Sequence, residues 1–185
     1  MAELKIKARL SFVKLFEPES YQGQDPKYSV ALLIPKENKN AIARINEAIE
    51  KAIQEGLKNP KYSWTERTPK ASSFKTPLHD GDEKADENEL YAAYEGCMYM
   101  NASNKKKPVL IDLDGENLTP DELYSGCWAN CILNIYPYNA GGGKGVTASI
   151  RGVQKYKDDE NLGGGAPVTA SSFDSGFGDD DEFFK

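Results

Sequence analysis

The stretch that decides the fold is CWANCILNIYPYNAGGGKGVTASIRGVQKY, residues 127–156. Its first part, residues 127–138, alternates small or aliphatic side chains with amides and rings, which is the period of a β-strand. The glycine-rich run 139–145 predicts a flexible hairpin loop, and residues 146–156 predict a second strand. A long hairpin of this kind indicates a mainly β fold.

Large rings and amides occupy the face of strand 127–138 that should meet water. That face carries Trp128, Asn130, Ile132, Asn134, Tyr136 and Tyr138, whereas the other face is apolar. A platform on which nucleic-acid bases stack would explain the exposed rings. A self-association surface would explain them too. Both explanations stay open here, and they can hold at different ends of the strand.

A first strand with a cationic face is predicted at residues 4–12. Its apolar face ends at Phe12, and Lys5, Lys7 and Arg9 follow one another on the other face. Edge strands use lysine to prevent aggregation. Three cations without an acid between them favour a track for phosphates instead. Residues 28–34 predict a second strand, which starts at Tyr28.

One long helix follows, because isoleucines repeat every three or four residues across positions 38–56. The irregular stretch 61–78 then mixes rings with cations, as a groove for single-stranded nucleic acid does. We expect Lys70 and Lys75 to line such a groove and Trp64 to pin the loop to the core. Residues 80–89 predict a solvated acidic loop.

Three shorter elements complete the body. Residues 94–102 predict a third strand, and a lysine turn that contains Lys105 and Lys106 leads to a short strand at 109–113. The capping box at 119–122 predicts one or two helical turns. Together the segments predict an OB-fold-like five-stranded barrel with one long and one short inserted helix. A β-sandwich is the competing topology.

The last segment, residues 158–185, has a different composition. It is rich in glycine and serine, and it carries eight acidic residues against one lysine. We expect a disordered tail on a body at residues 1–157 that is close to neutral. Such a polyanion can imitate nucleic-acid phosphates, its two terminal phenylalanines can enter a pocket on a partner, or it can merely confer solubility.

Several function classes are disfavoured. No apolar run is long enough to cross a membrane, and the first residues do not form a signal peptide, so we expect a cytoplasmic protein. Cys97, Cys127 and Cys131 have only His79 as a histidine companion, which predicts free thiols and neither metal nor cofactor. A metal-dependent nuclease or nucleotide-processing enzyme would need the acids of 80–89 or 112–116, which lack a rigid framework.

Five runs of sequence carry a resemblance to a known family. They are PKYSVALLIPK (26–36), HDGDE (79–83), NASNKKKP (101–108), ELYSGCWANCILNIYPYNAGGGKGV (122–146) and GVQKYKDDENLGG (152–164). In their order, the chain resembles the single-stranded-DNA-binding proteins of tailed phages, which have an OB-fold body and an acidic tail that ends in aromatics. This chain departs from that plan by ending on Lys185.

The resemblance implies a non-enzymatic protein that coats single-stranded DNA in phage replication, recombination and repair, in the cytoplasm of the bacterial host. It also implies a homodimer and tail contacts with replication proteins such as a polymerase or a helicase-primase. A protein adaptor without DNA contact is a further alternative.

The residues expected to bind DNA are cations and tyrosines of the body. They are Lys5, Lys7, Arg9, Tyr28, Lys70, Lys75, Lys105, Lys106, Tyr136, Tyr138, Lys144, Arg151, Lys155 and Tyr156. The residues expected to meet a partner protein are in the tail. They are Asp179, Asp180, Asp181, Glu182, Phe183 and Phe184.

Overall fold

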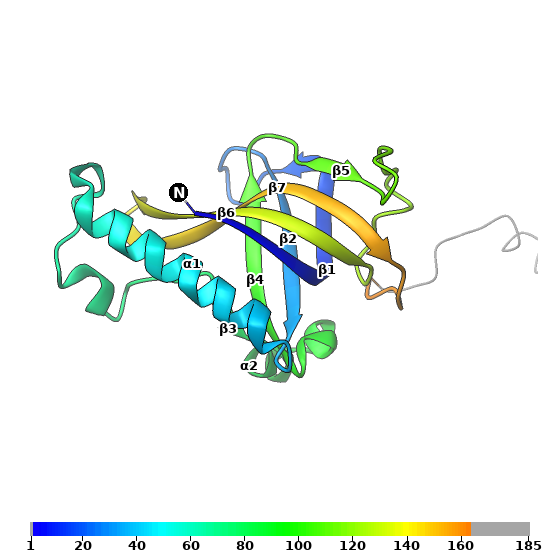
Figure 1. Cartoon of the computed structure of the whole chain (residues 1–185), viewed down its shortest axis with the longest axis horizontal. Helices are drawn as coiled ribbons and strands as arrows, with labels where there is room; N and C mark the ends of the chain where they lie inside the picture. Colours follow the sequence, from blue (N-terminus) through cyan, green and yellow to red (C-terminus); the bar gives the residue numbers. More distant parts are fainter. Residues whose placement is uncertain (1, 164–185) are drawn as a thin grey trace, which may run out of the picture.

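A computed structural model describes residues 2–163 of the 185-residue chain (Figure 1). The predicted partner-binding residues at 179–184 lie outside the described residues. The strands are β1 (Ala2–Glu19), β2 (Lys27–Pro35), β3 (Leu78–Asp80), β4 (Cys97–Asn104), β5 (Val109–Ile111), β6 (Trp128–Ala140) and β7 (Gly143–Lys157). The helices are α1 (Lys39–Lys58) and α2 (Gly81–Glu87), with short 3₁₀ turns η1 (Pro60–Tyr62), η2 (Thr68–Lys70) and η3 (Glu89–Tyr94).

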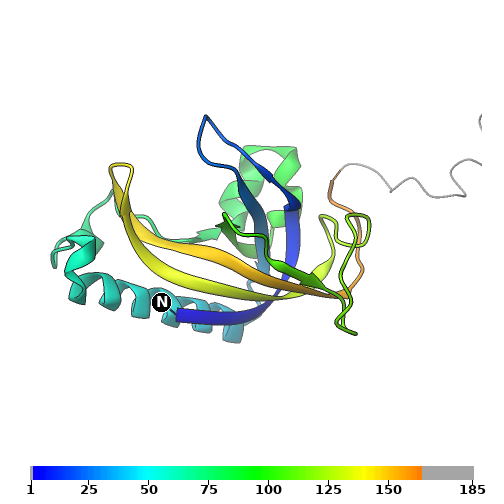
Figure 2. The same cartoon turned by 90° about the horizontal axis from the view of Figure 1, so that it is seen from above.

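The strands form one seven-stranded sheet in the order β3-β4-β2-β1-β6-β7-β5. The long strand β1 pairs with β6 through residues 2–9 and with β2 from residue 9 onward. The sheet therefore bends around β1, as Figure 2 shows. Strands β4 and β7 are not neighbours in the sheet order, but the bend brings them close together. The Asn104 side chain on β4 donates to the Ile150 carbonyl on β7 at 2.9 Å. No ladder within residues 2–163 closes the sheet, so an OB-fold-like curled sheet of seven strands replaces the expected barrel of five.

The core lies inside this curled sheet and is covered by α1. Alternate residues of β1, β6 and β7 point inward, among them Leu10, Leu133 and Ile150, all fully buried. Helix α1 adds Ile45 and Ile49 from its predicted apolar stripe. Trp64 is also buried, so the expectation that it pins the loop is confirmed.

Strand β1 corrects one prediction. Phe12 has a φ of +48°, and the pairing of β1 with β2 is irregular between Ser11 and Lys14. This irregularity breaks the alternation. Ser11 is consequently 4% exposed and Phe12 is 43% exposed, so the prediction that Phe12 lies on the core face is wrong.

Two loops and one helix also differ from expectation. The acidic stretch 80–89 contains α2 rather than a loop, because Asp80 caps the helix by accepting from the Asp82 amide at 2.8 Å. At 119–122 the capping-box bond from the Thr119 amide to Glu122 forms, but it closes a turn and no helix. The hairpin loop shrinks to Gly141 and Gly142, whose φ angles are positive and suit a two-residue turn.

Residues 158–163, here called the strap, are fastened across β1. The Trp128 indole nitrogen donates to an Asp159 carboxylate oxygen at 2.8 Å. Arg9 donates to the Glu160 carbonyl at 3.0 Å, and the Leu162 amide donates to the Ser125 carbonyl at 2.8 Å. The first six residues of the predicted tail are therefore bound to the body, and the domain boundary at residue 157 stays a prediction.

We expect Gly126→Ala to loosen the strap. Gly126 has a φ of +119°, and a Cβ atom there would lie 2.0 Å from the Glu160 carbonyl oxygen. Because the strap must shift, the free energy of unfolding in urea should fall by about 1–3 kcal/mol. Gly115→Ala is the control, since its φ of +84° is also unfavourable but no atom lies within 4 Å. Equal losses in the two variants would contradict this account of the strap.

Candidate nucleic-acid interface

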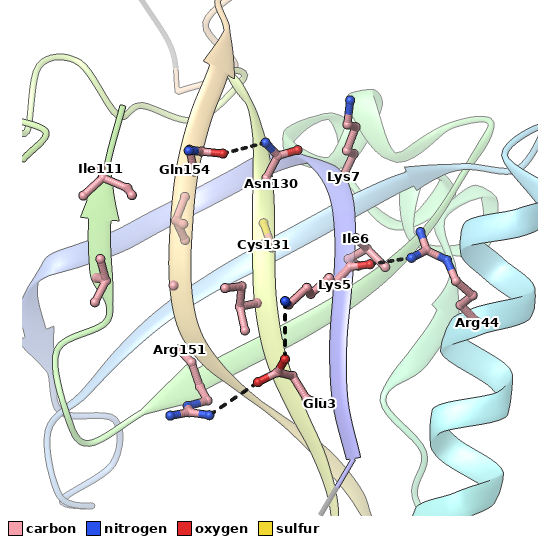
Figure 3. A pocket seen from close by; sticks show the side chains of 14 residues that line it. Glu3, Lys5, Ile6, Lys7, Arg44, Ile111, Asn130, Cys131, Arg151 and Gln154 are labelled. Atoms are coloured by element: carbon pink, nitrogen blue, oxygen red, sulfur yellow. Dashed lines mark hydrogen bonds and ion pairs between the residues drawn. The ribbon is translucent and has the colours of Figure 1, made fainter. Parts of the chain in front are cut away.

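Several predicted cations line one concave surface, which we call the basic groove (Figure 3). It encloses about 710 Å³ on the outer face of β1, β6, β7 and β5. Lys5, Lys7 and Arg151 lie on its walls, and Arg44 reaches it from α1. The sequence did not single out Arg44, because its helix has the mixed charges of an ordinary solvated face.

The floor of the basic groove is apolar. Ile132 on β6 and Val109 on β5 are 37% and 59% exposed, and both line the groove. Glu3 lies between two of the cations, 3.7 Å from Lys5 and 3.8 Å from Arg151. One carboxylate against four cations leaves the groove positively charged. An anion with an apolar part fits this surface better than a bare phosphate does.

Other predicted cations are engaged within the molecule. Arg9 is only 19% exposed, and it donates to the Gly126 carbonyl at 2.9 Å as well as to the strap. The Lys155 amine bonds the Glu122 carbonyl and the Asp158 carboxylate, each at 2.6 Å. The structure therefore uses both side chains to hold the strap and the preceding turn. Their predicted role in DNA binding stays a prediction.

A second surface consists of rings and is called here the aromatic face. Its rings form a continuous chain in the order Phe12, Tyr91, Tyr94, Tyr99 and His79, with centroid separations of 5.7, 5.3, 5.1 and 5.2 Å. They come from β1, η3, β4 and β3, so the sheet assembles them from distant parts of the chain. A concave surface of about 510 Å³ lies against four of these rings, with Lys14 and Lys84 at its border.

The rings of the aromatic face differ in their exposure to solvent. Tyr94 is 2% exposed, and its hydroxyl donates to the Ser11 hydroxyl at 3.3 Å. Burial raises the pKa of the Tyr94 hydroxyl, which marks it as a support rather than a contact residue. Phe12 is exposed, and Tyr91 and Tyr99 are partly exposed. These three rings are accessible for stacking.

The surface continues toward the β6–β7 hairpin. A neighbouring pocket of about 580 Å³ is lined by Lys75 and Tyr138, both predicted from the sequence, and also by His79 and Asn101. Asn101 lines this pocket and the one beside the rings. Lys144 lies nearby on β7, where its carbonyl accepts from the Lys75 amide at 3.2 Å. We call this part the hairpin pocket.

The remaining predicted residues are dispersed. Tyr28 packs against the core, and burial raises the pKa of Tyr136. Lys105 pairs with Asp25 at 2.8 Å. The other dispersed residues are Lys70 in η2, Lys106 in the turn after β4, and Tyr156, whose ring lies under the Lys7 amine at 4.8 Å.

Sequence reasoning missed most of the aromatic face. Tyr94 and Tyr99 were visible only as parts of a predicted strand, and Phe12 was assigned to the core. The available signal was the density of tyrosines at 91, 94 and 99. That signal does not show which face each ring occupies.

Residues 2–163 contain no candidate metal site and no reactive cysteine. No group of three candidate ligands there could hold a metal ion. All three cysteines are free, and burial raises the pKa of Cys131 to about 12, which leaves an unreactive thiol. None of the described helices is long and apolar enough to span a membrane.

Comparisons with known proteins give a consistent picture. A family model described as "Enterobacter phage Enc34, ssDNA-binding protein" matches residues 3–184. "Putative protein p50" of Acyrthosiphon pisum secondary endosymbiont phage 1 is 36% identical over 177 residues, covering 92% of this chain and 93% of that protein.

Solved structures agree with the family match. The single-stranded-DNA-binding protein of bacteriophage Enc34 in complex with ssDNA has a TM-score of 0.73 and 27% identity, over 87% of this chain and 89% of that chain. Gp2.5, a single-stranded-DNA-binding protein of bacteriophage T7, has a TM-score of 0.51 and 17% identity over 89% and 91% of the two chains, a likeness of fold alone.

We expect His79, the only histidine, to titrate below its usual pKa of 6.5 in an NMR titration. Burial against Tyr99 disfavours the imidazolium most, and the nearby charge of Lys84 lowers the pKa further. Lys84→Gln should therefore raise the pKa of His79 only partway toward 6.5. Lys14→Gln is the control and should leave it unchanged. A normal pKa in the unsubstituted protein would contradict the packing of His79 at the aromatic face.

Proposed function

The chain belongs to the family of the single-stranded-DNA-binding protein of Enterobacter phage Enc34, and we propose that it binds single-stranded DNA without sequence preference. The relatives found by structure are themselves binding proteins, a non-enzymatic class. The observation that carries the proposal is the aromatic face, a chain of rings on the outside of a curled sheet. Bases stack on such rings whatever their identity, because every base has a π-face.

The position of the aromatic face supports this assignment. In OB-folds, oligonucleotides bind across the second and third strands and the adjoining loops. Here β2 and β4 pair side by side, and Tyr99 and Asn101 lie on β4. The strand of DNA would run from Phe12 and Tyr99 to Tyr138 in the hairpin pocket. Lys14, Lys84 and Lys75 border this path and would meet phosphates.

Phosphate contacts make the binding dependent on salt. Each phosphate neutralised should contribute a slope of about −0.7 to the plot of log affinity against log salt concentration. Lys5, Lys7 and Arg151 stay predicted phosphate contacts in the basic groove. They lie on the same outer side of the curled sheet as the rings but beyond the bend, and the strap crosses β1 beside Arg9, between that groove and the aromatic face.

The acidic tail is the second part of the proposal. The tail would compete with DNA for the cationic side chains, and DNA would release it to recruit replication proteins such as a polymerase or a helicase-primase. Leu162 packs against the apolar cluster that includes Tyr94 and Tyr99. The strap therefore ends beside the aromatic face, and this position supports the proposal that the tail competes with DNA there.

The biological setting completes the proposal. The protein would act in phage DNA replication, recombination and repair, as a homodimer, in the cytoplasm of the bacterial host. The nuclease alternative is not favoured, because the carboxylates of Asp80 and Asp82 are both neutralised by the Lys36 ammonium. The Lys36 ammonium keeps the pKa of Asp80 below its usual value.

We expect Tyr99→Leu to weaken binding of an oligothymidine by about 1–3 kcal/mol in fluorescence anisotropy, because a stacked base loses its ring. Tyr99→Phe is the matched control, since it keeps the ring, and it should bind normally. If both variants bind like the unsubstituted protein, the aromatic face is not the stacking surface.

We expect deletion of residues 174–185 to tighten binding of single-stranded DNA at low salt. The deletion removes five carboxylates and one lysine that would otherwise compete with phosphates. The gain should shrink as salt rises, because screening weakens both competitors. Unchanged affinity at low salt, measured by the same anisotropy titration, would contradict competition by the tail.

A further inference from the structure

The tip of the β1–β2 hairpin, residues 20–26, projects from the curled sheet and adds nothing to the core (Figure 2). Its one large side chain is Tyr21, which is 71% exposed. Within residues 2–163 no other ring packs on Tyr21, and the Gln22 side-chain amide donates to its hydroxyl at 3.4 Å. A tyrosine that touches so little of its own molecule is available to a ligand.

Tyr21 lies at the border of the aromatic face. It lines the same concave surface of about 510 Å³ as Tyr91 and Tyr99. Asn101 lines that surface too, and it also lines the hairpin pocket. A strand of DNA that runs from Tyr99 to the hairpin pocket therefore passes Asn101, within the surface that Tyr21 borders.

The hairpin has a bulge at which its tip can turn. Strand β1 advances five residues between Lys14 and Glu19, while β2 advances only two between their partners, Ser29 and Lys27. Only the pair of Glu19 and Lys27 lies beyond this bulge. Extra residues interrupt the ladder and bend the strand that carries them. The tip is therefore joined to the sheet through an irregular segment.

The tip itself is compact. The Gln24 amide donates to the Tyr21 carbonyl at 3.0 Å, and Gln22 and Gly23 between them have φ angles of +49° and +76°. These angles suit a tight turn with two left-handed residues. Tyr21 is thus held by a turn that can move as one piece about the bulge.

Two ion pairs fasten the tip in the absence of DNA. Glu19 pairs with Lys14 at 2.5 Å, and Asp25 pairs with Lys105 at 2.8 Å. These side chains are between 43% and 74% exposed, so each pair is weak. Lys14 and Glu19 both line the aromatic face, whereas Lys105 and Asp25 do not. A phosphate on the aromatic face can therefore replace the Glu19 carboxylate beside Lys14 and leave the other fastening in place.

We propose that the tip of the β1–β2 hairpin is a clamp for bound single-stranded DNA. A phosphate of the strand takes Lys14 from Glu19, the tip turns at the bulge, and the Tyr21 ring closes on a base beside Asn101. This inference rests on the proposed function, because it adds a contact residue to the same path of the strand. A ring that closes after the strand has arrived slows its dissociation more than it speeds its association.

Stopped-flow release of a labelled oligothymidine from the full chain tests the clamp. Tyr21→Ala should raise the dissociation rate about tenfold, because one base loses its stacking partner, and should leave the association rate nearly unchanged. Tyr21→Phe is the matched control, since it keeps the ring, and it should release DNA at the normal rate. The tip lies outside the core, so circular dichroism should show the same thermal unfolding for all three proteins. An unchanged dissociation rate in Tyr21→Ala would overturn the clamp.

Photo-crosslinking gives a direct readout of the closed contact. An oligonucleotide with 5-iodouracil in place of thymine should crosslink to the tryptic peptide 15–27, which contains Tyr21. This crosslink should disappear in Tyr21→Ala, which separates Tyr21 from Phe16 of the same peptide. Crosslinks confined to the other rings of the aromatic face, or a crosslink to peptide 15–27 that survives Tyr21→Ala, would show that the tip does not close.

A pair of charge variants tests the exchange at Lys14. Glu19→Gln removes the carboxylate that occupies Lys14, so it should tighten binding at low salt severalfold, and the gain should fade as salt screens the charges. Glu17→Gln is the matched control, because Glu17 is on the same hairpin and has no ion pair to a described residue. Equal gains in the two variants would mean that Glu19 does not compete with phosphate, and the proposed exchange would be wrong.

The same experiments separate the clamp from the proposed function. If the unsubstituted protein does not bind the oligothymidine, or if Tyr99→Leu binds it normally, the aromatic face is not the stacking surface and both proposals fail. If Tyr99→Leu weakens binding while Tyr21→Ala releases DNA at the normal rate, the aromatic face stands and the clamp alone is wrong.

Discussion

The pairing of one long strand with two different partners is the constraint on which the rest of the structure depends. Strand β1 gives its first half to β6 and its second half to β2, so the sheet must bend where the partner changes. The irregularity at Ser11 and Phe12 lies at the start of the second half. It turns a phenylalanine outward and brings it against Tyr91 of η3.

The same bend separates two kinds of surface. The basic groove lies outside the first half of β1, and the aromatic face lies beside the second half. The strap crosses between them and is held by Arg9 and Trp128. A cation expected to meet phosphate is thus used to fasten the chain, which explains why charge alone does not locate a binding surface.

The two surfaces divide the chemistry of the molecule. Rings with a few bordering lysines suit a polymer of stacked bases. Exposed aliphatic side chains inside a cationic border suit an anion with an apolar part. Ile132 on the floor of the basic groove would be a poor contact for DNA, because its side chain neither stacks on a base nor pairs with a phosphate.

The sequence by itself indicated most of the strands, the long helix α1 and the family, because periodic burial and family likeness are properties of the chain alone. Lys75 and Tyr138, both predicted from the sequence, line the same pocket, and their role in binding DNA stays a prediction. Only the tertiary structure decided which rings meet, since Phe12 and Tyr91 are joined by the bend of a sheet. Likewise, whether Arg9 is free depends on its contact with Glu160 of the strap, 151 residues away, and no local pattern encodes a contact at that separation.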